Sequence, residues 1–172
     1  MMVATHRALF RSPFMSSPTT TATGDWHRFF AVDCNQLVWK LLAKADRTAD
    51  DNLTMLHAAH ASYFHWLHVG KIENHARGEW MCARVYTVLG ETEPALRHAQ
   101  HALSLCEAHG IGDFDLAYAY EAMARAHAAA DQRYAARQFH VLAAGAAHEI
   151  KQEDDRKIFL QDLHAEPWFG VF

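Results

Sequence analysis

Histidine is the side chain of this protein best suited to proton transfer or metal binding, with 14 copies among 172 residues. The densest group comprises His57, His60, His65, His68 and His75. On a helix, His60 would share an apolar stripe with Leu53, Leu56, Phe64 and Leu67, with His57 at its edge. A buried imidazole needs a hydrogen-bond partner and has a lowered pKa, conditions that also describe a catalytic or metal-ligating histidine.

Glu73 or Glu79, on the next predicted helix, could supply a carboxylate to this group. The sequence contains neither H-E-x-x-H nor Glu-x-x-His pairs on two helices, which are the spacings typical of metal centres on helices. An enzyme or metal-binding protein that depends on histidine or a metal, centred on His57 and His60, is therefore the alternative hypothesis. We expect no cofactor and no assigned metal site.

His98 and His101 form a second candidate pair, three residues apart and able to share one side of a helix. Helical projection turns His101 away from the small-residue stripe, leaves His98 on its flank, and places the cation Arg97 one turn before His101. No third ligand lies within a turn, so the pattern predicts a solvent-exposed face.

Other signatures of enzymes are absent from the sequence, including G-x-S-x-G, glycine-rich phosphate loops and paired cysteines. Cys34 next to Asp33 could resemble a nucleophile, but such coincidences arise easily in a chain so rich in histidine. With Cys82 and Cys106, it is expected to be a small core residue in a reducing compartment, which predicts a cytoplasmic protein. The sequence favours binding over catalysis.

Charge and hydropathy narrow the class of partner. The 16 basic and 20 acidic residues are spread along the chain, so no nucleic-acid partner is expected. Charged residues and histidines interrupt each apolar stretch well before the roughly 20 residues of a membrane span, so no membrane partner is expected either. Protonating every histidine would move the net charge from -4 to +10, which suggests a pH-responsive structural protein as a third hypothesis.

Long amphipathic runs separated by short breaks, with only 4 prolines, predict helix almost everywhere after residue 25. The expected helices are 27–44, 49–69, 73–89, 92–109, 114–130 and 133–149, followed by a capping helix at 151–164. Links this short force neighbouring helices into antiparallel hairpins. The predicted organisation is a disordered N-terminal tail (1–25), a helical domain (26–164) and an aromatic C-terminal tail (165–172).

An internal repeat of 41 residues relates these hairpins. At this shift residues 80–86 fall on 121–127, and Ala95 and Ala102 fall on Ala136 and Ala143. The opposite shift places Trp80 on Trp39. Three units follow, 28–70, 73–110 and 114–150. Stacking them would give the continuous core that a lone hairpin cannot form.

The middle unit carries a family resemblance. Ala83, Tyr86, Gly90, Ala95 and Ala102 resemble the tetratricopeptide-repeat signature of a small residue, an aromatic, a turn glycine and two alanines. The 41-residue period exceeds the typical 34, and the closing proline is missing, which is similar to the longer-helix variety of bacterial and kinesin-light-chain-type repeats. The resemblance implies an all-α fold, a short right-handed α-solenoid of three antiparallel helix hairpins plus a C-terminal capping helix.

The resemblance also implies a concave surface lined by the first helix of each unit. The 41-residue shift places in its rows, or beside them, the predicted binding residues Trp39, Lys40, Arg77, Trp80, Arg84, Tyr118, Glu121 and Arg125. Arginine forks suit carboxylates, and flat aromatic faces bury apolar area and stack on peptide planes. The leading hypothesis is therefore a protein-protein interaction or regulatory module, for which an acidic or carboxylate-ended peptide would be a suitable partner and homodimerisation a further option.

The sequence leaves two structural alternatives open. Trp39 and Trp80 could instead fill the core between helices while the arginines pair with Glu79 and Glu121. The tail, with aromatic residues at 168, 169 and 172, could fold back into its own groove or dock on a neighbour. It could also pack on the capping helix beside Phe159 and Leu163.

Overall fold

The computed structural model describes residues 20–172, and this part of the chain is all-α and contains no β-strand. Its elements are α1 (Thr20–Leu42), α2 (Ala49–Val69), α3 (Ile72–Leu89), α4 (Thr92–His109), α5 (Asp113–Ala129), α6 (Arg133–Ala146), the short 3-10 helix η1 (Ala147–Glu149) and α7 (Glu153–His164). No helix among the described residues combines the length and the apolar character needed to cross a membrane.

Local capping chemistry explains why several predicted boundaries are accurate. Thr48 begins α2 with a capping box, in which the Asp51 backbone N–H donates to Thr48 Oγ1 (3.1 Å) and the Thr48 N–H donates to Asp51 Oδ2 (2.8 Å). Gly90 and Gly110 end α3 and α4 in the left-handed conformation, with φ of 77° and 64°. Glycine adopts this conformation without the strain that a Cβ atom would cause.

The start of α1 differs from the prediction. The helix begins at Thr20 and not at residue 27, so residues 20–25 belong to a helix and not to the predicted tail. Gly24 lies beside Val69 at the end of α2, and this neighbouring helix gives the first turns of α1 a packing partner that the local sequence does not reveal. Residues 1–19 of the predicted tail lie outside the described residues.

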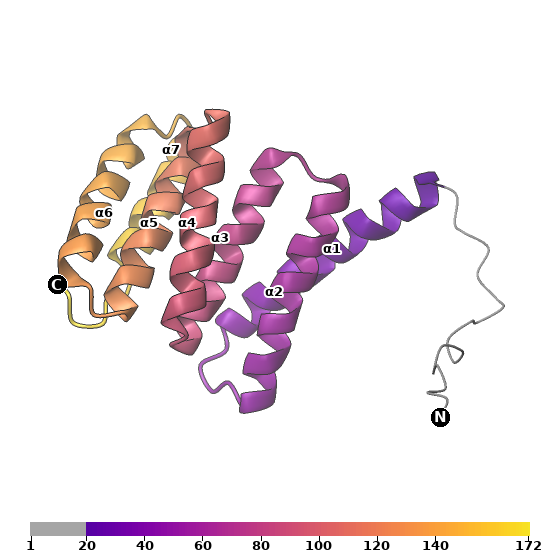
Figure 1. The fold of residues 1–172 in the computed structure, drawn as a ribbon, viewed down its shortest axis with the longest axis horizontal. Helices are drawn as coiled ribbons and strands as arrows, with labels where there is room; N and C mark the ends of the chain where they lie inside the picture. Colours follow the sequence, from indigo (N-terminus) through magenta and orange to yellow (C-terminus); the bar gives the residue numbers. More distant parts are fainter. Residues whose placement is uncertain (1–19) are drawn as a thin grey trace, which may run out of the picture.

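The helices pack as successive hairpins, α1 with α2, α3 with α4 and α5 with α6, and α7 then packs on α5 and α6 (Figure 1). The hairpins follow one another along the long axis of the molecule. The predicted period holds between the second and third hairpins, because α3 begins at Ile72 and α5 at Asp113, 41 residues later. The same interval separates the starts of α4 (Thr92) and α6 (Arg133).

Small residues form the contact between the helices of the second and third hairpins. Ala95, Ala99 and Ala102 of α4 are almost completely buried, as are Ala136 and Ala143 of α6. Alanine at these positions lets the second helix approach the first closely, so the predicted packing role of the repeated alanines is confirmed.

The C-terminal tail is part of the core. Trp168 and Val171 are buried in one cluster with Phe159 and Leu163 of α7. Arg137 of α6 holds the tail by donating from Nη2 to the Val171 carbonyl oxygen at 2.8 Å. Of the alternatives left open by the sequence, packing beside the capping helix is observed for Trp168 and Val171, and the start of the tail also contacts Arg125, a predicted groove residue.

Candidate binding site

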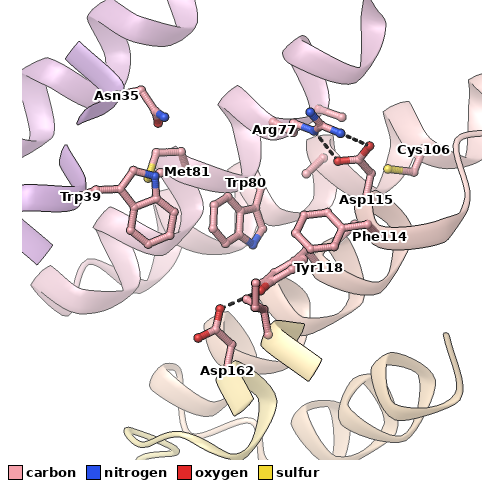
Figure 2. Close-up of a pocket in the computed structure, with 14 residues that line it drawn as sticks. Asn35, Trp39, Arg77, Trp80, Met81, Cys106, Phe114, Asp115, Tyr118 and Asp162 are labelled. Carbon is pink, nitrogen blue, oxygen red and sulfur yellow. Dashed lines mark hydrogen bonds and ion pairs between the residues drawn. The ribbon is translucent and has the colours of Figure 1, made fainter. Parts of the chain in front are cut away.

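The predicted aromatic residues of α1, α3 and α5 meet around one cavity of about 290 Å³ (Figure 2). Trp39 comes from α1, Trp80 and Arg77 from α3, and Tyr118 from α5. The lining is completed by residues that the sequence did not single out, chiefly Asn35, Met81, Phe114, Asp115, Ile158 and Asp162. The first helices of three hairpins therefore contribute to a single concave site.

Ring contacts make the wall of this cavity continuous. The ring centroids of Trp39 and Trp80 are 5.9 Å apart, and those of Trp80 and Tyr118 are 5.2 Å apart with the planes at 76°. Phe114 extends the wall, its centroid 4.6 Å from that of Tyr118. Trp39 remains 41% exposed, so the wall is open to solvent on the α1 side. The alternative of core filling is therefore wrong for Trp39. It describes Trp80, which packs against all three core clusters, and the arginines Arg84 and Arg125, which pair with Glu121.

The acidic groups at the rim already have partners. Arg77 donates from Nε and Nη2 to the two oxygens of Asp115 at 2.6 and 2.9 Å, a bidentate pair. The Tyr118 hydroxyl donates to Asp162 Oδ2 at 2.7 Å. Burial and then the bond to Asp162 raise the pKa of Tyr118, so this hydroxyl remains a hydrogen-bond donor. The walls of the cavity are apolar, and its rim is polar and fixed.

Two predicted binding residues lie below the surface. Glu121 is 1% exposed and accepts a hydrogen bond from Arg125 Nε, one turn further along α5. Arg125 also donates to carbonyl oxygens of the C-terminal segment, and both side chains are structural. Lys40 is exposed and is not among the residues that line the cavity.

Arg84 occupies an intermediate position between the cavity and the buried pair. Its Cζ lies 5.6 Å from the ring centroids of both Trp39 and Trp80, within the range of cation-π attraction. Its Nη1 is 3.9 Å from Glu121 Oε1. The predicted row of Trp39, Trp80 and Arg84 therefore forms one cluster at the edge of the cavity.

A separate polar cluster joins α2, α3 and α4 around the buried carboxylate of Glu79. His98 donates from Nδ1 to Glu79 Oε2 at 2.5 Å, and Nδ1 of His101 lies 3.5 Å from Oε1. The prediction of a solvent-exposed face is wrong for His98, whose side chain is 14% exposed, whereas that of His101 is 58% exposed. Sequence projection missed the pair because Glu79 belongs to another helix.

Gly78 allows this cluster to close. A Cβ atom at position 78 would lie 2.4 Å from Cδ2 of Tyr63, so only glycine lets the Tyr63 ring sit against α3. Tyr63 hydrogen-bonds to Glu79 from this position. Burial raises the pKa of Glu79, but hydrogen bonds from His98 and Tyr63 outweigh burial and hold that pKa below its ordinary value.

His60, the centre of the alternative hypothesis, shares a hydrogen bond of 2.9 Å with the Tyr86 hydroxyl through Nε2. Its Nδ1 lies 3.9 Å from Cys82 Sγ, and burial raises the pKa of that thiol to about 12. His57 is exposed. Within residues 20–172, histidine, cysteine and acidic side chains form no group of three or more that could hold a metal ion.

Comparisons with protein-family models, curated protein sequences and solved structures found no match to this chain. Any function assigned to it therefore rests on its own residues and geometry.

Proposed function

We propose that this chain is a tetratricopeptide-like α-solenoid that binds a peptide segment of a partner protein on the face formed by α1, α3 and α5. The succession of hairpins, the 41-residue interval between equivalent helices and the buried alanines support the repeat architecture. Helical repeats of this kind present extended concave surfaces, and such surfaces are used for binding.

The observation that carries the proposal is the cavity between Trp39, Trp80 and Tyr118. Its volume of about 290 Å³ is at the lower end of ligand sites, which suits one large side chain of a peptide and not a complete cofactor. Trp80 Nε1 is buried and has no hydrogen-bond partner among the described residues. Buried donors are normally satisfied, and a ligand carbonyl could satisfy this one only after the indole ring moved to expose Nε1.

Selection from a random peptide library on the immobilised full chain would test the proposal. Trp39→Ala should lower the affinity for the selected peptides more than tenfold, because truncating a central aromatic anchor typically removes over about 1.4 kcal/mol of binding free energy. Trp26→Ala is the matched control, since Trp26 is an exposed tryptophan of the same helix that does not line the cavity. Failure to select any binder, or equal effects of the two substitutions, would reject a binding role for the cavity.

A further inference from the structure

Arg125 shows what an arginine at this position of the repeat can hold. Its guanidinium donates to the carbonyl oxygens of Asp162 at 2.5 Å and of Ala165 and Pro167 at 3.1 Å. Its Cζ also lies 4.2 Å from the ring centroid of Trp168. The side chain thus binds the main chain of an irregular segment and stacks on an aromatic ring.

Arg84 is the equivalent residue of α3, 41 positions earlier, and it has the aromatic support without the peptide. Trp39 and Trp80 provide the ring contacts. Nη1 of Arg84 is buried and lacks a hydrogen-bond partner within residues 20–172. The Arg84 side chain is 25% exposed, against 9% for Arg125, so part of this side chain is open to a ligand although Nη1 itself is buried.

A small hollow of about 50 Å³ connects the two arginines. Arg84 and Thr87 line it from α3, Glu121 and Arg125 from α5, and Ala165 and Pro167 from the C-terminal segment. On its other side the Arg84 guanidinium rests on Trp39 and Trp80, which line the larger cavity. An extended segment bound to Arg84 would therefore have the aromatic cavity beside it.

The charges around Arg84 indicate which kind of segment would bind. Glu121 and Glu166 border the hollow, and Asp115 and Asp162 border the cavity. Arg77 is paired with Asp115, and Arg125 is paired with Glu121. The four carboxylates outnumber Arg77, Arg84 and Arg125, so the site offers an acidic ligand no excess of positive charge. Main-chain carbonyl oxygens are acceptors without a net charge and need no such excess.

We propose that Arg84 binds main-chain carbonyl oxygens of an uncharged, extended partner segment whose aromatic side chain enters the cavity between Trp39, Trp80 and Tyr118. This inference rests on the proposed peptide-binding function and names the chemistry of the peptide. The sequence suggested an acidic or carboxylate-ended peptide. The peptide proposed instead is recognised through its backbone, as Arg125 recognises residues 162–167.

The probe is the peptide Ala-Gln-Pro-Trp-Phe-Gly, the sequence of residues 165–170 with glutamine in place of Glu166, acetylated, amidated and labelled with a dye. It is uncharged and contains Ala165 and Pro167, whose carbonyl oxygens Arg125 binds. Fluorescence anisotropy with the full chain should show saturable binding. Arg84→Lys should weaken it more than tenfold, because lysine keeps the charge and loses the planar fork of donors. Arg97→Lys is the matched control, since Arg97 is an exposed arginine on α4 that pairs only with Glu93 among the described residues.

Three results would overturn the inference. The peptide could fail to bind below 1 mM, or bind equally well after Arg84→Lys, which would place it elsewhere, for example at Arg125. The form with a free C-terminal carboxylate could bind more than tenfold tighter than the amide, which would indicate carboxylate recognition. None of these results would decide the proposed binding function, because the library selection with Trp39→Ala tests that function independently. Unfolding curves would verify that the Arg84→Lys variant folds.

Discussion

The junction between α3 and α5 and the junction between α1 and α3 use equivalent positions of the repeat in opposite ways. At the first, the helices pack directly, and Arg125 and Glu121 are buried beneath the C-terminal segment. At the second, α1 and α3 meet through Trp39, Trp80 and Arg84, and this side of the cavity, which α5 and α7 also line, is open to solvent at Trp39. An arginine at one repeat position is therefore structural where its own chain supplies carbonyl oxygens, and accessible where it does not.

The residues facing each junction explain the difference. Trp39 and Trp80 occupy equivalent positions, and their two indole rings separate α1 from α3. The equivalent residue of α5 is Glu121, whose side chain turns along its own helix to Arg125 and leaves room for close packing of α3 on α5. One change of residue type, from tryptophan to glutamate, thus accompanies the change from an open to a closed junction.

The largest expected effect comes from removing the segment that closes the α5 side. Truncation after His164 deletes Trp168 and Val171 from the core, and loss of one buried tryptophan side chain alone costs about 3–5 kcal/mol. We expect the free energy of unfolding in urea to fall by at least about 4 kcal/mol. Deleting only the exposed Phe172 should cost less than about 1 kcal/mol. Similar losses for the two truncations would show that the segment does not close the junction.

Exchanging the two arginines for methionine compares the junctions directly. Arg125→Met leaves the buried Glu121 with only the longer contact of 3.9 Å to Arg84, and breaking a buried pair in this way costs about 3–5 kcal/mol of folding stability. Arg84→Met removes cation-π contacts at a partly exposed site, worth about 1 kcal/mol, and leaves the pair of Glu121 and Arg125 intact. Chemical denaturation of both variants would measure the contrast, and equal losses would contradict the distinction between a structural and an accessible arginine.

A lower pH should destabilise the fold through one histidine at each end of the molecule, and this is the smallest of the expected effects on stability. Burial lowers the pKa of His60, and the neighbouring His98 and His57 lower it further. Burial also lowers the pKa of His140, and His164 and Arg125 add to this effect. Glu79 acts in the opposite direction on His60, and Glu121 on His140. In the unfolded chain histidine titrates near pH 6.5, so below that pH the unfolded state binds more protons and stability decreases.

The thermal midpoint should therefore be lower at pH 5.5 than at pH 7.5. His60→Gln and His140→Gln should each reduce this pH dependence, and the larger reduction would identify the end of the molecule that acid loosens first. A midpoint that stays constant between these pH values would remove the hypothesis of a pH-responsive protein.

The helices and the repeat could be predicted because both depend on local chemistry. Thr48, Gly90 and Gly110 determine helix ends within a few residues of sequence, and the alanine spacing reports the close helix contacts directly. The contacts between hairpins were harder to predict. Arg77 pairs with Asp115 and Trp80 contacts Tyr118, each 38 residues on, because the nearest neighbour across two packed helices need not be the equivalent residue of the repeat.

Features that do not repeat could not be found from the period at all. The bonds of Arg125 to the C-terminal segment involve residues with no counterpart in the other units. Asp162 and Ile158 reach the cavity from α7, which is outside the repeat. The bond between His98 and Glu79 depends on the rotation of α4 against α3, and one-helix projections do not contain that information.

The glycine at position 78 controls more than its own contact. Because the Tyr63 ring of α2 lies where a methyl group at position 78 would be, a larger residue there would push α2 away from α3, and α1, which packs on α2, would move with it. The distance between the indole rings of Trp39 and Trp80 therefore depends on the distance between α2 and α3. Variation at this one residue would tune the width of the aromatic slot without altering any side chain inside it.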